Sequence, residues 1–276
     1  MSYIAITLAI FVTVLFLRFC FRYGWWIPAI DYKEPRILMY HMISEAEKGA
    51  KFNGLRVAPD QFEKQLQWFN QNNWTFIKMS QLIEKTSKLP PKSVALTFDD
   101  GFEDNYTHAY PLMKKYGASG TLYLVIDRHN RDWSSDKKAH HNSGELMHEP
   151  KLSDTQISEM LDSGVFELGA HTITHANLAK LSGQQKQLEI ENSKQQLEQL
   201  FNTNITSFAY PFGIYDQQDV NIVNNSGFIS AVTTEVGISP APYTDPMKLK
   251  RVKISGKDNF LAFRLRMKTG KRGYLK

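Results

Sequence analysis

Short apolar runs alternate along the chain with longer stretches in which apolar residues recur every three or four positions. The short runs have the length and flanking polar residues of buried strands. Seven strands are predicted, at 37–40, 74–77, 94–98, 120–126, 165–169, 207–210 and 228–232. Helices are predicted between most of them, at 62–69, 153–164, 182–200 and 217–225. This alternation favours one domain with a mainly parallel sheet, either open or closed into a barrel.

The N-terminus carries a longer apolar segment of another kind. Tyr3 to Leu17 is uncharged, and apolar residues resume beyond Arg18. The segment is long enough to cross a bilayer if Arg18 and Arg22 extend to the interface. A cleaved signal peptide is the alternative, but no basic residue precedes the run and no small-x-small site follows it. We therefore predict an uncleaved anchor in residues 1–30 and one domain in residues 31–276.

Basic residues are concentrated at two places. Arg18, Arg22 and Lys33 all follow the apolar run, and this distribution favours a cytoplasmic position for the domain. The C-terminal stretch 248–276 is strongly basic and contains one acid, Asp258. Within it, 259–267 mixes apolar residues with arginines. That pattern fits a surface helix on anionic lipid and equally a last helix packed on the domain.

Composition narrows the chemistry. Hydrophobic residues make up 42% and charged residues 22% of the 276 residues, as in soluble globular domains. The 33 basic and 28 acidic residues leave a net charge of +5, too weak to predict a nucleic-acid partner. The single cysteine, Cys20, excludes an intramolecular disulfide and a cysteine-based zinc site. Any metal must be held by histidine and carboxylate.

Two segments carry candidate ligands at predicted strand ends. The first ends in the adjacent carboxylates Asp99 and Asp100, which point to opposite sides and can serve different roles, one for a metal and one for a proton. The second ends in His171 and His175, whose spacing lets both imidazoles face one ion. Two histidines with one carboxylate are a common ligand set for zinc and related ions. The two segments together predict a divalent-metal site.

These segments resemble a known family. Thr97–Gly101 and His171–His175 are similar to the first two motifs of the polysaccharide deacetylases of the NodB-homology family, also called carbohydrate esterase family four. Phe208–Gly213 is similar to the third motif, and the resemblance extends from about Arg36 to Ile254. It implies an α/β fold, a distorted (β/α) barrel of about seven strands, here preceded by one transmembrane helix.

The resemblance also implies roles for individual residues. Asp99 corresponds to the general base, and Asp100, His171 and His175 correspond to the metal ligands. The backbone N–H of Phe212 corresponds to the donor that holds the oxyanion. Candidate substrate-binding residues near the third motif are Tyr210, Pro211 and Tyr215.

Two parts of the family pattern are missing. Ala209 stands where an arginine usually tethers the base, and no histidine follows His175 to act as the general acid. Tyr40–Ile43 resembles a segment of the circularly permuted poly-β-1,6-N-acetylglucosamine deacetylase subgroup, in which this histidine is the acid. We therefore predict His41 as the general acid.

The expected function is metal-dependent removal of N-acetyl groups from an N-acetylglucosamine-containing polysaccharide or glycan precursor. Zinc is the expected metal, with cobalt or nickel as alternatives. The membrane and the acetylated polysaccharide are the expected partners, and the family resemblance implies an extracytoplasmic domain, against the charge distribution. An O-acetyl esterase, a lipid-linked sugar deformylase and a catalytically weak glycan-binding protein remain alternatives.

Overall fold

The computed structural model describes residues 3–84, 88–133 and 144–274, and its element order alternates strands with helices. The strands are β1 (Arg36–Tyr40), β2 (Thr75–Ile77), β3 (Ser93–Asp99), β4 (Gly120–Leu124), β5 (Phe166–Ala170), β6 (Ser207–Ala209), β7 (Ser230–Val236) and β8 (Leu249–Lys253). The longer helices are α1 (Tyr3–Tyr23), α2 (Pro59–Gln71), α4 (Tyr110–Tyr116), α7 (Asp154–Asp162), α8 (Gly183–Phe201), α9 (Gln217–Asn225) and α10 (Phe260–Thr269). Shorter helical segments are α3 (Met79–Glu84), η2 (Asn105–Ala109), α6 (Glu145–His148), η3 (Leu178–Lys180), η4 (Pro211–Gly213) and η5 (Pro246–Lys248).

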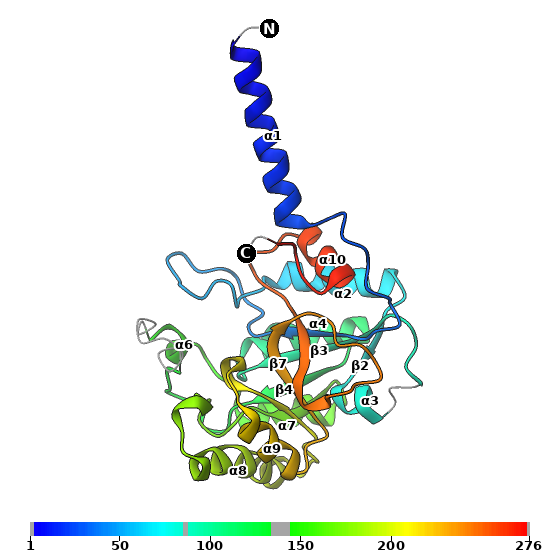
Figure 1. Ribbon diagram of the computed structural model, residues 1–276. Coiled ribbons are helices and arrows are strands. Elements are labelled where there is room, and N and C mark those ends of the chain that lie inside the picture. Colours follow the sequence, from blue (N-terminus) through cyan, green and yellow to red (C-terminus); the bar gives the residue numbers. More distant parts are fainter. Residues whose placement is uncertain (1–2, 85–87, 134–143, 275–276) are drawn as a thin grey trace.

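Seven strands close into a parallel barrel. Their order is β1-β8-β7-β6-β5-β4-β3, and β3 pairs back with β1 to complete the ring. The short strand β2 pairs with the first residues of β3, from Ser93 to Ala95. Helices surround the barrel (Figure 1). The structure confirms the expected distorted (β/α) barrel, and parallel strands place the carboxyl ends of all seven at the same rim.

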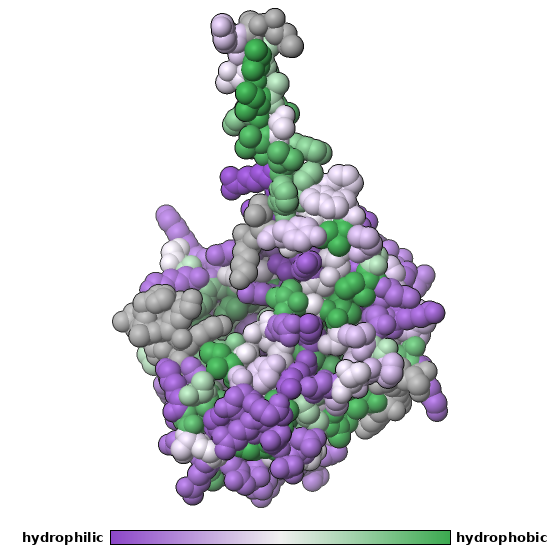
Figure 2. Space-filling view, viewed as in Figure 1, coloured by the Kyte–Doolittle hydropathy of each residue, from purple (hydrophilic) through white to green (hydrophobic). Residues whose placement is uncertain are grey.

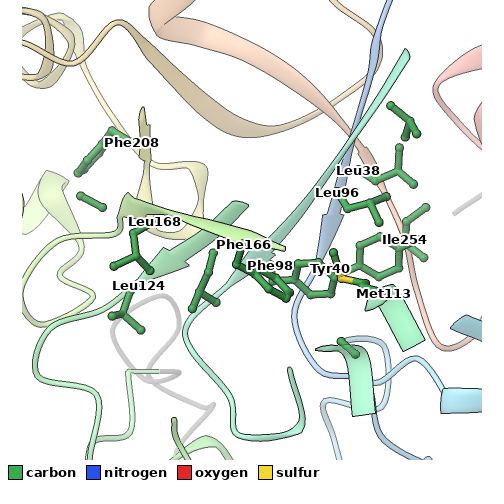
Figure 3. Close-up of a cluster of buried hydrophobic side chains, with 14 of the residues drawn as sticks. Leu38, Tyr40, Leu96, Phe98, Met113, Leu124, Phe166, Leu168, Phe208 and Ile254 are labelled. Carbon is green, nitrogen blue, oxygen red and sulfur yellow. The ribbon is translucent and has the colours of Figure 1, made fainter. Parts of the chain in front are cut away.

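Successive residues of each strand point to opposite sides of the barrel wall, so the strands contribute to two hydrophobic clusters. Residues pointing outward pack beneath the helices, among them Tyr40, Phe98 and Phe166 (Figure 3). A second cluster, from alternate positions of the same strands, includes Ala95 and Tyr123. Gly169 lies beside Tyr123, and a Cβ at this position would come within 2.4 Å of the ring. A glycine is therefore required where β5 passes the tyrosine.

Most expected elements appear, and one strand was missed. The buried face of α2 includes Phe62, Leu66 and Phe69, as their spacing predicts, and a capping box at Ser153 starts α7. The sequence does not predict strand β8, because its residues LKRVK lie in the strongly basic C-terminal stretch 248–276. Its hydrogen-bonded neighbours β1 and β7 make it the strand that closes the barrel.

The C-terminal segment lies beside the last turn of helix α1. Helix α1 projects from the body, its apolar side chains exposed along nearly its whole length (Figures 1 and 2). By length and composition it can cross a membrane, and a signal sequence passes the same test. The backbone N–H of Tyr274 donates to the carbonyl of Phe21, 2.9 Å away, and Ile30 N–H donates to the carbonyl of Lys268. The C-terminal segment therefore packs against the foot of α1.

Helix α10 lies on the protein body. Its Phe263 is buried and contacts the rings of Trp68 and Phe69, with centroids 5.5 Å apart in both cases. Of the two interpretations left open for this segment, the observed packing corresponds to a last helix on the domain. Leu261 remains exposed.

Candidate active site

The carboxyl ends of the barrel strands bring together residues that lie far apart in sequence. Asp99 is the last residue of β3, with Asp100 directly after it, and His171 directly follows β5. His41 follows β1 at the same rim. All four line one cleft of about 780 Å³, together with His175. The structure thus assembles the predicted base, acid and ligands in a single site.

Asp100, His171 and His175 have the geometry of a metal site. One oxygen of Asp100, Oδ1, lies 3.4 Å from Nε2 of His171 and 3.3 Å from Nε2 of His175. Ligand atoms of a tetrahedral zinc ion with bonds of about 2.0–2.1 Å are separated by about 3.3–3.4 Å. That Asp100 oxygen is buried and accepts no well-formed hydrogen bond within the described residues. The three residues therefore fit a divalent ion.

The protein also sets the tautomer of a ligand. Nδ1 of His171 lies 2.7 Å from the carbonyl oxygen of Ala209, which requires the proton on Nδ1 and leaves the lone pair on Nε2. Burial alone would raise the pKa of Asp100, but the neighbouring imidazoles of His175 and His171 hold that pKa well below its usual range. Asp100 is therefore ionised, as a metal ligand must be.

Backbone strain accompanies the site. Asp100, Thr172, His175 and Phe212 all have positive φ, between 56° and 79°. Such left-handed backbone is uncommon for residues other than glycine and is retained where the surroundings enforce it. Its concentration in the predicted motif segments indicates that side-chain placement there outweighs local conformational preference.

Asp99 is held by an arginine that the sequence analysis did not identify. Arg251, an inward-facing residue of β8, donates from both terminal nitrogens to the two oxygens of Asp99, each over 2.7 Å. It also donates to Thr97 and to the carbonyl of Thr233. Both members of the pair are almost completely buried. Burial would raise the pKa of Asp99, but the charge and hydrogen bonds of Arg251 lower it, so the carboxylate is ionised.

Arg251 replaces the missing family arginine. Ala209 leaves the third motif without a cation, and β8, two strands away from β6 in the sheet, supplies one. Bidentate pairing fixes the orientation of the carboxylate as well as its charge. A possible signal in the sequence was the alternation in 249–253, which places Leu249 and Arg251 on the same face of a strand.

His41 is positioned by the segment that follows the first motif. Nδ2 of Asn105, a fully buried residue, donates to the backbone carbonyl of His41 over 2.8 Å. Burial lowers the pKa of His41, and the carboxylates of Asp100 and Asp99 partly offset this effect. His41 therefore lies near the carboxylates of Asp100 and Asp99 in the cleft.

Two aromatic rings enclose His175. Trp133 stacks on its imidazole with centroids 5.0 Å apart, and Phe212 contacts it edge-on at 4.4 Å. Trp133 was not predicted, because it lies in a polar segment without periodicity. The cleft wall continues through Phe52 and Leu146.

The predicted substrate residues occupy different environments. Phe212 and Tyr210 line the cleft, whereas Pro211 is buried in turn η4. Tyr215 stacks on Tyr210 with centroids 4.4 Å apart and lies outside the cleft lining. The structure brings Phe212 closest to the ligand cluster.

A buried ion cluster ties two loops into the cleft wall. Arg56, only 2% exposed, forms ion pairs with Glu149 and with Glu145. The carboxylate of Glu145 accepts hydrogen bonds from the backbone N–H of Phe52, at 3.1 Å, and of Lys51. These contacts hold the loop after β1 against the segment that carries Leu146.

Asp104, which supports the His41 loop, gives a pH-dependent prediction. Burial raises its pKa to about 6, despite hydrogen bonds from Ile43 N–H and Ser44. The pKa of Asp104 is higher in the folded than in the unfolded protein, so ionising this carboxyl lowers the free energy of unfolding. The cost is absent below about pH 4, grows between about pH 4 and 6, and is complete above about pH 6. Asp104→Asn should therefore raise the free energy of unfolding at pH 7.5 by up to about 3 kcal/mol and leave it unchanged at pH 3.5. Urea denaturation at the two pH values measures this, and a gain at both would contradict the assignment.

Comparison with known proteins identifies the class. A family model for polysaccharide deacetylases matches residues 86–230. The Bacillus subtilis (strain 168) protein YxkH, named for that family, is 31% identical over 215 residues, covering 77% of this chain and 68% of its own. The chain belongs to the polysaccharide deacetylase family, which confirms the resemblance read from the motifs and the predicted enzyme class.

Two further relatives are informative. The poly-β-1,6-N-acetyl-D-glucosamine N-deacetylase of Staphylococcus aureus (strain MRSA252) is 24% identical, with 72% of each chain covered. The Streptococcus pyogenes deacetylase PplD, solved in complex with acetate, is 28% identical with a TM-score of 0.68, covering 84% of this chain and 95% of its own. These similarities extend beyond the motif segments to most of the barrel.

Proposed function

We propose that the protein hydrolyses the N-acetyl group of an N-acetylglucosamine-containing glycan, with Asp99 as the base and His41 as the acid. The observation that carries the proposal is the Asp99–Arg251 pair beside the Asp100, His171 and His175 cluster in one cleft. The N-acetylglucosamine unit is proposed from the similarity to the staphylococcal enzyme.

The chemistry requires a proton acceptor and a proton donor on the same cleft. Asp99, ionised and oriented by Arg251, takes a proton from water as the water oxygen forms a bond to the acetyl carbonyl carbon. His41 then gives a proton to the amide nitrogen as the carbon–nitrogen bond breaks, releasing acetate and the free amine. The backbone N–H of Phe212 is proposed to stabilise the oxyanion, a contact that typically contributes about 3–4 kcal/mol.

Asp100, His171 and His175 would hold the divalent ion. When bound, the ion polarises the acetyl carbonyl and lowers the pKa of water in the site. Two imidazoles and one carboxylate, with the Asp100 oxygen 3.4 and 3.3 Å from the two imidazole nitrogens, suit zinc, with cobalt and nickel as alternatives. We propose zinc as the resident metal.

Helix α1 is proposed to anchor the domain of residues 31–276 to a membrane. Its apolar side chains are exposed in the structure, and burying them in lipid would remove a large apolar surface from water. We propose an extracytoplasmic domain, as the family resemblance implies. A C-terminal topology reporter tests this, and reporter activity on the cytoplasmic side would reverse the orientation.

Acetate release tests the proposed activity. The full-length protein in neutral detergent is incubated with β-1,6- or β-1,4-linked N-acetylglucosamine oligomers and zinc, cobalt or nickel. Metal-dependent release is expected, and Asp99→Asn should reduce it by about 10²–10⁴-fold. Asp60→Asn, which alters an exposed carboxylate of α2, is the matched control. Release only from O-acetylated or N-formylated analogues would replace the proposal by an esterase or a deformylase.

A further inference from the structure

The cleft continues beyond the catalytic groups to a second end. There its wall is formed by β8 and the C-terminal segment. The charged residues at this end are Lys253, Lys257, Asp258, Arg266, Lys271 and Arg272. This end of the cleft is therefore lined by five cationic side chains and one carboxylate. The proposed deacetylation uses none of them.

The single carboxylate is already engaged by cations. Asp258 binds Arg266 at 2.6 Å through one oxygen and Arg272 at 2.7 Å through the other. For Lys257 and Lys271 no ion pair occurs within the described residues. Lys271 is placed over the ring of Tyr274, with its ammonium 4.9 Å from the centroid. An excess of positive charge thus remains at this end of the cleft.

This cationic end lies at the foot of α1. Tyr274, which lines the cleft, donates its backbone N–H to Phe21 in the last turn of α1. The backbone at Gly273 is so close that a Cβ would come within 2.4 Å of the carbonyl oxygen of Arg22. Asn259 also donates to the hydroxyl of Tyr23 over 3.1 Å. Figure 1 shows the segment that follows α10, in red, beside this end of the helix.

Basic side chains on a surface are usually solvated and need no ligand. Lys257 and Lys271, however, line the same cleft as the proposed base and acid. The one carboxylate beside them, Asp258, is already paired with two arginines. Ammonium groups on flexible stems bind phosphate as compact point charges. A substrate that extends along the cleft from Asp99 would reach the end that these lysines line.

We propose that the substrate carries a phosphate ester next to its N-acetylated sugar, and that Lys257 and Lys271 hold this phosphate. The inference rests on the proposed deacetylation for the position of the sugar. It narrows the substrate class from neutral N-acetylglucosamine polymers to phosphate-bearing glycans, either soluble or attached to a lipid in the bilayer that α1 enters.

Equilibrium binding tests the phosphate site without requiring turnover. Full-length protein in neutral detergent is titrated with N-acetylglucosamine and with N-acetylglucosamine 1-phosphate. The phosphate form should bind at least about tenfold more tightly, as charge-assisted hydrogen bonds provide. The Lys257→Gln/Lys271→Gln double variant should lose most of this preference. The charge-matched control Lys64→Gln/Lys115→Gln, which alters exposed lysines of α2 and α4, should keep it.

Two further measurements distinguish a lipid-linked phosphate from a soluble one, and distinguish failure of the phosphate site from failure of the proposed deacetylation. Tighter binding to phosphatidylcholine vesicles that carry a polyprenyl-phosphate-linked N-acetylglucosamine would assign the phosphate to a membrane lipid, and equal binding would assign it to a soluble sugar phosphate. Equal affinity for the two soluble sugars, or a preference that survives in the cleft double variant, would overturn the phosphate site. Acetate release from neutral oligomers alongside that result would leave the deacetylase proposal intact.

Discussion

Replacing Arg251 by methionine should lower the free energy of unfolding by about 3–5 kcal/mol, because it leaves the carboxylate of Asp99 buried without a partner. It should also change the pH dependence of catalysis. Arg251 lowers the pKa of Asp99 against the effect of burial, so its removal raises that pKa. A base must be ionised to act, and the acidic limb of kcat/KM should therefore move to higher pH. Urea denaturation and pH–rate profiles measure the two effects.

A matched variant separates positioning from general destabilisation. Arg36 is equally buried, but it lies at the opposite end of β1 from His41 and binds backbone carbonyls, including that of Met267. Arg36→Met should lower stability without moving the acidic limb. If Arg251→Met also leaves that limb in place, Arg251 is a structural residue and does not act through Asp99.

Removing both members of the pair provides a second check. Asp99→Asn alone leaves the guanidinium of Arg251 buried and unpaired, whereas Asp99→Asn/Arg251→Met removes both charges. The double variant should be more stable than either single variant, because buried pairs can often be replaced by apolar residues at little cost. It should remain inactive. Recovered turnover would show that Asp99 is not the base.

The ligand cluster could be predicted because its members lie in short segments at strand ends. Asp99 and Asp100 are adjacent, and His171 and His175 are four positions apart, so local patterns reveal each pair. The parallel topology then places both pairs at one rim. His41 required the family resemblance, since a lone histidine after a strand carries no chemical signal.

Arg251 could not be found in this way. It pairs with Asp99 across 152 positions of sequence. The charged residues beside it give its strand the composition of a solvent-exposed segment. Closing a seven-stranded ring buries inward-facing residues of every strand, including polar ones. The absence of a cation before Pro211 indicated that one was needed, but only the closed barrel shows which residue supplies it.

The basic C-terminal stretch illustrates the same difficulty at a larger scale. Its composition fits a surface helix on anionic lipid and equally a last helix packed on the domain, and in the structure it divides into a barrel strand, a packed helix and part of the cleft wall. Phe263 is buried among core aromatics, whereas Lys257 and Lys271 face the cleft. The density of charge in a sequence does not distinguish a buried strand or helix from a cleft wall. The strand and the helix within this stretch are too short for a clear periodic pattern.

Exchanging single histidines should separate metal binding from proton donation. His171→Gln removes an imidazole from the proposed ligand set, and should lower both the metal content of the purified protein and its turnover, the latter by about 10³-fold or more. His41→Gln should retain the metal while kcat falls by about 10²–10⁴-fold. Metal analysis after dialysis and steady-state kinetics give the two readouts. His148→Gln, at an exposed position of α6, is the matched control.

Metal content and turnover together distinguish a metal ligand from a proton donor. If His41→Gln loses metal as completely as His171→Gln, His41 belongs to the ligand set and the acid must come from another group. If His171→Gln retains a full equivalent of metal, the Asp100 cluster is not the metal site, despite donor distances of 3.3 and 3.4 Å. Metal retained only in the His41 variant, with turnover lost in both, is the result that the geometry predicts, because the carbonyl of Ala209 fixes His171 with Nε2 toward Asp100.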